Sequence, residues 1–334
     1  MKIQKLIIIT LLAVLLLTGC SGQNTTATND SAEATQAETV NVTSAPTESE
    51  TAAPEATAAT SAPSTQASDP TVAPANVDPN ATYDYEVREI WTENNGNRIY
   101  IYGEAYIPIT DGKSPLILFS HGLGSNHESG ESYAKKVAPR GFAVYTWDFP
   151  GGSSVNNENR SDGNNLEMSV MTEASDLDAI IKTAKTWDFV DTDRIFLAGG
   201  SQGGLVTAIG GVRHEDEVAG LILLYPAFGM AALADRYSDD MPDEVQISSM
   251  TVGKPFFRDM IGYDVRDEIP NFDKPVLIIQ GSEDNLVLPS VSREAADLYP
   301  DCEYRIIEGA GHGFSGEEHD IATEYALDFL FRHI

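Results

Sequence analysis

A serine enclosed by glycines lies between an apolar segment and a stretch of small residues. The order along the chain is 194–198, expected to form a buried strand, then Gly199-Gly200-Ser201-Gln202-Gly203, then 205–211, expected to begin a helix. Strand, Gly-x-Ser-x-Gly turn and helix is the pattern of a nucleophile elbow, which exposes a serine hydroxyl on a sharp turn. The pattern predicts Ser201 as a nucleophile rather than a small turn residue, provided that a base lies beside it.

Candidate partners for this serine follow later in the chain. An apolar strand at 275–280 runs into Glu283 and Asp284, and a second strand at 304–307 runs into His312, which glycines flank. Loops after parallel strands meet at one edge of a sheet, so these side chains are expected near Ser201. We predict His312 as general base and then acid, and Asp284 as the carboxylate that orients it. Glu283 and Asp301 remain alternative carboxylates.

Backbone amides that could hold a negatively charged oxygen are expected at two places. One is the N–H of Gln202, directly after the nucleophile. The other belongs to the loop after the strand at 116–120, where Leu123 is preferred and Gly122 is the alternative. His121 in the same loop is expected to brace the loop rather than carry a proton.

Strand and helix patterns follow one another through residues 81–334. Strands at 83–92 and 98–108 surround a turn, and 168–186 has the apolar periodicity of a helix. This alternation predicts an α/β fold with a mostly parallel central sheet and helices on both faces. The order Ser201, Asp284, His312 is that of the α/β-hydrolase fold.

Residues 83–334 resemble the serine esterases of the α/β-hydrolase type, and among them the bacterial cinnamoyl (feruloyl) esterases and serine aminopeptidase-like hydrolases. The matching pieces are 120–126, 148–153, 160–163, 200–204 and 311–314. The resemblance implies that Leu123 and Gln202 supply the oxyanion amides. Gly200 and the segment 151–153 depart from the pattern of that family, which usually has histidine in both places.

The first 80 residues have a different composition. Residues 1–19 carry Lys2 and Lys5 before an apolar run, as in a secretory signal peptide. The sequence around Cys20 resembles a bacterial lipobox, which implies a lipid on Cys20 and a location at the outer face of the bacterial cell membrane. Residues 20–80, rich in Thr, Ser, Ala and Pro, are predicted to be a disordered linker, so the folded domain is placed at 81–334.

The segment 228–272 interrupts the alternation between two expected strands. It carries methionines and phenylalanines such as Met250 and Phe256 among many acidic residues. We predict a small cap over Ser201 that sets substrate choice through these side chains. The alternative is a connector whose apolar residues pack onto the sheet.

Composition excludes several kinds of partner. The net charge of −30 argues against binding to nucleic acid or to another anionic polymer. We expect no metal or cofactor, because zinc-ligand spacing, a phosphate loop and a dinucleotide fingerprint are not found. Cys302 is expected to be an inert residue at a strand edge.

The predicted reaction is cleavage of a carboxylic ester through an acyl-enzyme, with a small-molecule or polysaccharide-linked ester as substrate. A serine peptidase or an acyltransferase would use the same residues. A lipoprotein that only binds a ligand is a third hypothesis. The acyl and alcohol groups and the oligomeric state are left open by the sequence.

Overall fold

The computed structural model describes residues 72–334 with the exception of residues 97, 155–156 and 248. The chain divides into two units, Met1–Ser64 and Thr65–Ile334, and the described residues all belong to the second. The predicted signal peptide, Cys20 and most of the predicted linker lie outside the described residues.

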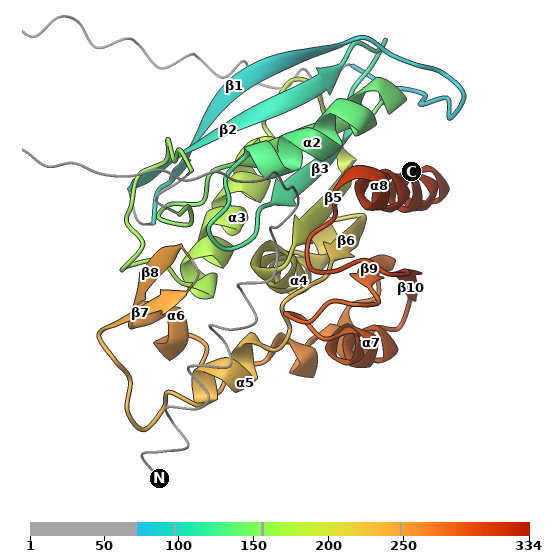
Figure 1. Cartoon of the computed structure of the whole chain (residues 1–334). Coiled ribbons are helices and arrows are strands. Elements are labelled where there is room, and N and C mark those ends of the chain that lie inside the picture. Colours follow the sequence, from blue (N-terminus) through green and yellow to red (C-terminus); the bar gives the residue numbers. More distant parts are fainter. Residues whose placement is uncertain (1–71, 97, 155–156, 248) are drawn as a thin grey trace, which may run out of the picture. The chain divides into compact units, whose positions relative to one another are not determined.

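An eight-stranded sheet forms the centre of this unit (Figure 1). The strands lie in the order β1-β2-β4-β3-β5-β6-β9-β10. The pairs β1–β2 and β2–β4 are antiparallel, and every pair from β4 onward is parallel, as predicted. The strands are β1 (Tyr85–Asn94), β2 (Ile99–Pro108), β3 (Ser114–Ser120), β4 (Ala143–Trp147), β5 (Val190–Gly200), β6 (Gly220–Leu224), β9 (Val276–Gly281) and β10 (Cys302–Ile307).

Helices cover both faces of the sheet because its strands are apolar on both sides. In β5, Ile195 and Leu197 belong to one core cluster, and Phe196 and Ala198 belong to the other. Successive side chains of a strand point to opposite faces, so an unbroken apolar run fills two cores. The helices of the first core are α3 (Val170–Ala184), α4 (Gln202–Arg213) and α7 (Pro289–Leu298), and those of the second are α2 (Glu128–Val137) and α8 (Gly316–Arg332).

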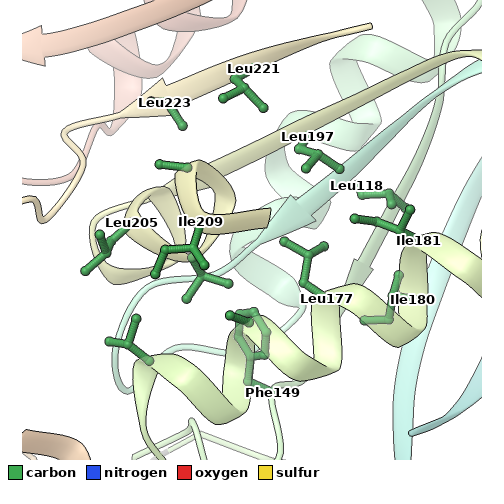
Figure 2. Packing of buried hydrophobic residues seen from close by; sticks show 14 of the residues in the cluster. Leu118, Phe149, Leu177, Ile180, Ile181, Leu197, Leu205, Ile209, Leu221 and Leu223 are labelled. Atoms are coloured by element: carbon green, nitrogen blue, oxygen red, sulfur yellow. The ribbon is translucent and has the colours of Figure 1, made fainter. Parts of the chain in front are cut away.

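The core between α3, α4 and the sheet holds the serine loop in place. Figure 2 shows side chains from three strands meeting those of the two helices. The residues labelled there are Leu118, Leu197, Leu221 and Leu223 from the strands, Leu177, Ile180 and Ile181 from α3, Leu205 and Ile209 from α4, and Phe149. Leu177 and Ile209 are fully buried, which fixes α4 against the end of β5.

The folded unit begins earlier than residue 81. Pro74 forms a bridge with Lys113, and the Ala75 N–H donates to the Lys113 carbonyl at 2.8 Å. Val77 is 8% exposed and belongs to the second core cluster. The predicted linker boundary at residue 80 is therefore wrong by several residues. Two buried apolar side chains, Ala75 and Val77, and a few backbone hydrogen bonds suffice to hold such a segment, and composition does not reveal them.

The segment 228–272 packs largely into the core. It contains α5 (Met230–Asp235), the antiparallel pair β7 (Glu244–Ile247) and β8 (Met250–Gly253), α6 (Pro255–Arg258) and two short 3₁₀ helices, and it is drawn in yellow to orange in Figure 1. Phe256, Phe257 and Met260 are each 1% exposed and share the core cluster of α3 and α4. The predicted substrate-facing role for Phe256 is therefore wrong. The segment is too short to form a core of its own, so its aromatic rings are buried in the core that it shares with α3 and α4.

Candidate active site at the serine turn

Ser201 occupies a strained turn between β5 and α4. Its backbone angles are φ 55° and ψ −120°, which a residue with a side chain rarely adopts. The Ser201 N–H donates to the Leu224 carbonyl, and the Ser201 carbonyl accepts from the Ala227 N–H, both at 2.9 Å. These two bonds anchor the turn to the end of β6. Such strain persists only where the surrounding structure enforces it, and it is typical of functional sites.

The glycine at position 203 allows α4 to approach the loop after β3. A Cβ atom on Gly203 would lie 2.2 Å from the Ser120 carbonyl oxygen and 2.4 Å from that of His121. Backbone atoms cannot move aside for a methyl group at that distance. The last glycine of the Gly-x-Ser-x-Gly pattern therefore brings the serine turn against the loop that carries Leu123.

Ser201, His312 and Asp284 form one hydrogen-bonded chain. The Ser201 Oγ lies 3.0 Å from His312 Nε2, and the Asp284 Oδ2 lies 2.8 Å from His312 Nδ1. Serine and histidine are 111 residues apart in the sequence. With Nδ1 protonated toward the carboxylate, Nε2 faces the hydroxyl as an acceptor. This arrangement can take a proton from a serine oxygen and return it to a leaving group.

The Asp284 carboxylate is buried and receives hydrogen bonds on both oxygens. Its Oδ1 accepts from the N–H groups of Leu286 and Val287, both at 2.9 Å, and its Oδ2 also accepts from Gln280 Nε2 at 3.0 Å. Burial by itself would raise the pKa of Asp284. The hydrogen bond and charge of His312, together with the two backbone N–H groups, outweigh burial and lower the pKa. The carboxylate therefore stays ionised beside the imidazole.

The other two candidate carboxylates point elsewhere. Glu283 and Asp301 are exposed, whereas Asp284 is 1% exposed. Asp301 precedes β10, and its carbonyl oxygen accepts from the Val276 N–H at the start of β9. The structure thus brings Asp284 to the histidine and leaves both alternatives at the surface.

The two predicted oxyanion amides belong to segments next to the serine. Gln202 is the first residue of α4, where a backbone N–H has no acceptor within the helix. The loop of Leu123 passes close to Ser201, because a Cβ on Gly122 would lie 3.3 Å from the Ser201 Cβ and 4.0 Å from its Oγ. Among the described residues, the Leu123 N–H donates to no backbone acceptor. The positive end of α4 adds to the attraction for a negatively charged oxygen at this place.

His121 braces the loop from inside. Its Nε2 accepts from the Phe149 N–H at 2.9 Å, and its Nδ1 donates to the Gly122 carbonyl at 2.8 Å. Burial lowers the pKa of His121 to about 4, so the ring is neutral and holds one proton, on Nδ1. The expectation that His121 supports the loop rather than carrying a proton agrees with this geometry.

Three side chains at the site were missed by the sequence reasoning. Tyr225, with φ 38°, places its ring edge against His312 at 4.9 Å between centroids. Gln280 donates to Asp284 and accepts from Ser292 Oγ at 2.6 Å. Glu173 is buried beside Gln202. The sequence did carry a signal for two of them. Glu173 is a polar residue on the apolar face of a helix, and Gln280 is a polar residue in an apolar strand.

Met250 of the segment 228–272 lies against the oxyanion loop. Its Sδ lies 3.3 Å from the position that a Cβ on Gly124 would take. Met250 is itself 1% exposed, so it packs under the loop rather than forming an open surface. The predicted cap therefore touches the site through β8.

The fold described above is similar to that of solved structures. The ferulic acid-bound Est1E from Butyrivibrio proteoclasticus matches with a TM-score of 0.67 and 23% identity, over 73% of this chain and 98% of that chain. The esterase EaEST from Exiguobacterium antarcticum matches with a TM-score of 0.56 and 18% identity, over 73% and 100% of the chains. The chain has the α/β-hydrolase fold.

Comparisons of sequence cover less of the chain. Residues 113–241 match the family described as serine aminopeptidase, S33. The non-heme chloroperoxidase CPO-A1 from Kitasatospora aureofaciens is 32% identical over 59 residues, which are 17% of this chain. The chain spans 22% of the length of that curated relative.

The described residues contain no group of three or more His, Cys, Asp or Glu placed to hold a metal ion. In the same part of the chain, no helix is long and apolar enough to cross a membrane.

Cys302 is a free thiol at the start of β10, and burial raises its pKa to about 12, which makes it a poor nucleophile.

Proposed function

We propose that this protein is a serine hydrolase that cleaves carboxylic esters through an acyl-enzyme intermediate. The observation that carries the proposal is the hydrogen-bonded chain from Ser201 through His312 to the buried Asp284 carboxylate. Serine, histidine and carboxylate in this order form the arrangement that activates a hydroxyl for attack on an acyl carbon.

In the proposed reaction, Ser201 Oγ attacks the acyl carbon while His312 Nε2 takes its proton. Asp284 stabilises the protonated imidazole, and the N–H groups of Leu123 and Gln202 bind the oxygen that becomes negative. His312 then gives the proton to the leaving alcohol, and the acyl group stays on Ser201. A water molecule, deprotonated by His312, attacks the acyl group and restores the serine.

The proposed substrates are small-molecule or polysaccharide-linked esters with an aromatic or short acyl group. The likeness to a ferulic acid-bound structure supports the aromatic class, although that ligand belongs to the other protein. A serine peptidase is the second candidate, because residues 113–241 match the serine aminopeptidase family. An acyltransferase would use the same serine with another acceptor. A protein that only binds its ligand is disfavoured by the intact chain of hydrogen bonds.

Labelling with a fluorophosphonate probe tests the proposal directly. The full chain should be labelled covalently, and Ser201→Ala should not be labelled while keeping its fold. Rates with p-nitrophenyl esters, methyl ferulate and aminoacyl anilides then separate esterase from peptidase. Equal ester hydrolysis by wild type and a folded Ser201→Ala variant would remove the proposal.

We also propose that the mature protein is attached to the outer face of a bacterial cell membrane by a lipid on Cys20. The support is in the sequence alone, where an apolar run after Lys2 and Lys5 leads to Cys20. The segment between Cys20 and the folded unit would act as a tether. The acidic net charge of −30 supports a small-molecule ester rather than nucleic acid as partner.

A further inference from the structure

A buried carboxyl group lies directly behind the serine turn. Glu173 is in the first turn of α3 and is 1% exposed. Its Oε2 lies 2.8 Å from the Nε2 of Gln202, which is itself 2% exposed and follows Ser201 in the chain. The side chain that Glu173 holds therefore belongs to the residue whose backbone N–H is the proposed oxyanion donor.

The surroundings of Glu173 favour the neutral acid. Burial raises the pKa of Glu173, the hydrogen bond from Gln202 lowers it, the nearby acid Asp176 raises it, and the result is about 8. Among the described residues, no cation is one of the groups that act on it. A carboxylate with one neutral donor and no cation is costly to bury, so the proton is retained at neutral pH.

Other titratable groups face this region from each neighbouring element. His121, from the loop after β3, is neutral. It lies near Glu173 beside Gly152, because a Cβ on Gly152 would be 3.2 Å from the His121 Cε1 and 3.1 Å from the Glu173 Oε1. After β4 comes Asp148, whose Oδ1 is bonded to His127 Nδ1 at 2.7 Å.

On α3 itself, Asp176 accepts from Asn94 Nδ2 at 2.8 Å. After α6, Asp259 accepts from Ser169 Oγ, at the start of α3, at 2.8 Å. Both of these carboxyl groups are bonded to partners other than Gln202. Glu173 is therefore the acid in this group that contacts the residue after the serine.

We propose that Glu173 is a positioning residue: its protonated carboxyl fixes the Gln202 side chain, and thereby the Gln202 N–H beside Ser201, and its ionisation slows the reaction. This inference rests on the proposed function. A neutral carboxyl orients the amide without adding charge, whereas a carboxylate would place negative charge behind the site where the substrate oxygen becomes negative. Catalysis of this kind depends on preorganised dipoles that favour that negative charge.

The test is the pH dependence of kcat for ester hydrolysis between about pH 6 and 10, with an expected alkaline decline in the wild type near the ionisation of Glu173. Glu173→Gln retains a neutral group of the same shape and should keep kcat at pH 7 within a few-fold while losing the alkaline decline. Asp176→Asn is the matched control, because it removes the other buried acid of α3 and should keep the decline. A decline that persists in Glu173→Gln, or that is absent from the wild type, overturns the inference.

Truncation provides a second, independent test. Glu173→Ala should lower kcat by roughly 10- to 100-fold with a smaller change in KM, since a displaced catalytic group costs about this much. If Glu173 acts through Gln202, the double variant Glu173→Ala, Gln202→Ala should lose no more than the larger single loss. Losses that multiply, or an unchanged kcat in Glu173→Ala, overturn the inference.

Failure of the proposed function gives a different result. In that case Ser201→Ala would hydrolyse the ester as fast as wild type at every pH. If Ser201→Ala is inactive and Glu173→Gln keeps the alkaline decline, the esterase proposal stands and only the role of Glu173 falls. Circular dichroism at each pH ensures that a decline in rate is not unfolding.

Discussion

Replacing Asp284 by asparagine tests the centre of the proposed mechanism. The carboxylate accepts four hydrogen bonds, two on Oδ2 from His312 and Gln280 and two on Oδ1 from the N–H groups of Leu286 and Val287. An asparagine has one oxygen and one NH₂ group, so it can serve only one of these two pairs. The change keeps the shape and removes both the charge and half of the acceptors.

Both orientations of the asparagine side chain in Asp284→Asn damage the site. If the NH₂ group faces His312, the imidazole must accept at Nδ1, and its proton moves to Nε2, which can then no longer take the proton of Ser201. If it faces the backbone, two N–H groups lose their acceptor. Gln280 is tied to Ser292 at 2.6 Å and cannot readily reverse its amide to compensate.

The expected loss of kcat/KM is about 10⁴-fold, the size found when a triad carboxylate elsewhere is replaced by its amide. The free energy of unfolding should fall by about 1–3 kcal/mol, the usual cost of a buried polar group without a partner. Because the pKa of Asp284 is lowered, its ionised form stabilises the fold above the unfolded value of 3.8, and this contribution disappears as the pH falls through the folded pKa. The stability gap between wild type and Asp284→Asn should therefore narrow in acid.

The assay is steady-state hydrolysis of p-nitrophenyl butyrate together with denaturant unfolding. Glu283→Gln is the matched control, because it makes the same chemical change at an exposed neighbour and should leave both quantities within error. A folded Asp284→Asn protein with kcat/KM within about tenfold of wild type would refute the assignment, since the triad logic requires a loss near 10⁴-fold. A loss of that size in Glu283→Gln would refute it as well.

Three further outcomes follow from the same geometry. Glu173→Gln should be more stable than wild type at pH 8 by roughly 2–5 kcal/mol, at about 1.4 kcal/mol per pKa unit. The reason is that the folded pKa of Glu173, about 8, exceeds the unfolded value of 4.5, so ionisation of this acid destabilises the folded wild type. Denaturant unfolding should show the difference in stability between the two proteins closing as the pH falls to 4.5. Met250→Ala should change the ratio of rates for short and bulky acyl esters. Phe256→Ala should keep that ratio and lower the free energy of unfolding by about 3–5 kcal/mol. If both variants gave the same ratio of rates, a role of Met250 in substrate choice would be contradicted. Cys20→Ser should move the protein from the detergent phase to the aqueous phase with unchanged turnover, and equal partitioning would argue against a lipid anchor.

The elements around the serine were predictable because their signals are local. The apolar run of β5 with alternating side chains to two cores, the glycines around Ser201 and the small residues of α4 each belong to a few consecutive positions. Periodicity reports such elements well. The same holds for β9 and β10, whose ends carry Asp284 and His312.

The segment 228–272 shows where local signals stop. Its methionines and phenylalanines suggest an apolar surface, and the sequence cannot say whether that surface faces a substrate or the core. Phe256, Phe257 and Met250 are all buried, and Met250 packs beneath Gly124. Burial depends on what the rest of the chain places above a side chain, which a short window does not contain.

The sequence by itself determined the fold class, the strands that carry the site residues, the helices α3 and α4, and the residue types and order that support an acyl-transfer site. The tertiary structure decided which carboxylate meets His312, why residues before 81 join the domain, and that Glu173 lies behind Gln202. The first of these depends on the adjacency of β5, β6, β9 and β10, which joins residues 111 positions apart. The second depends on contacts with Lys113 before β3, and the third on the contact between α3 and α4. Such adjacency is fixed by how all the elements pack together, because each strand finds its neighbours through the shared core rather than through its own sequence.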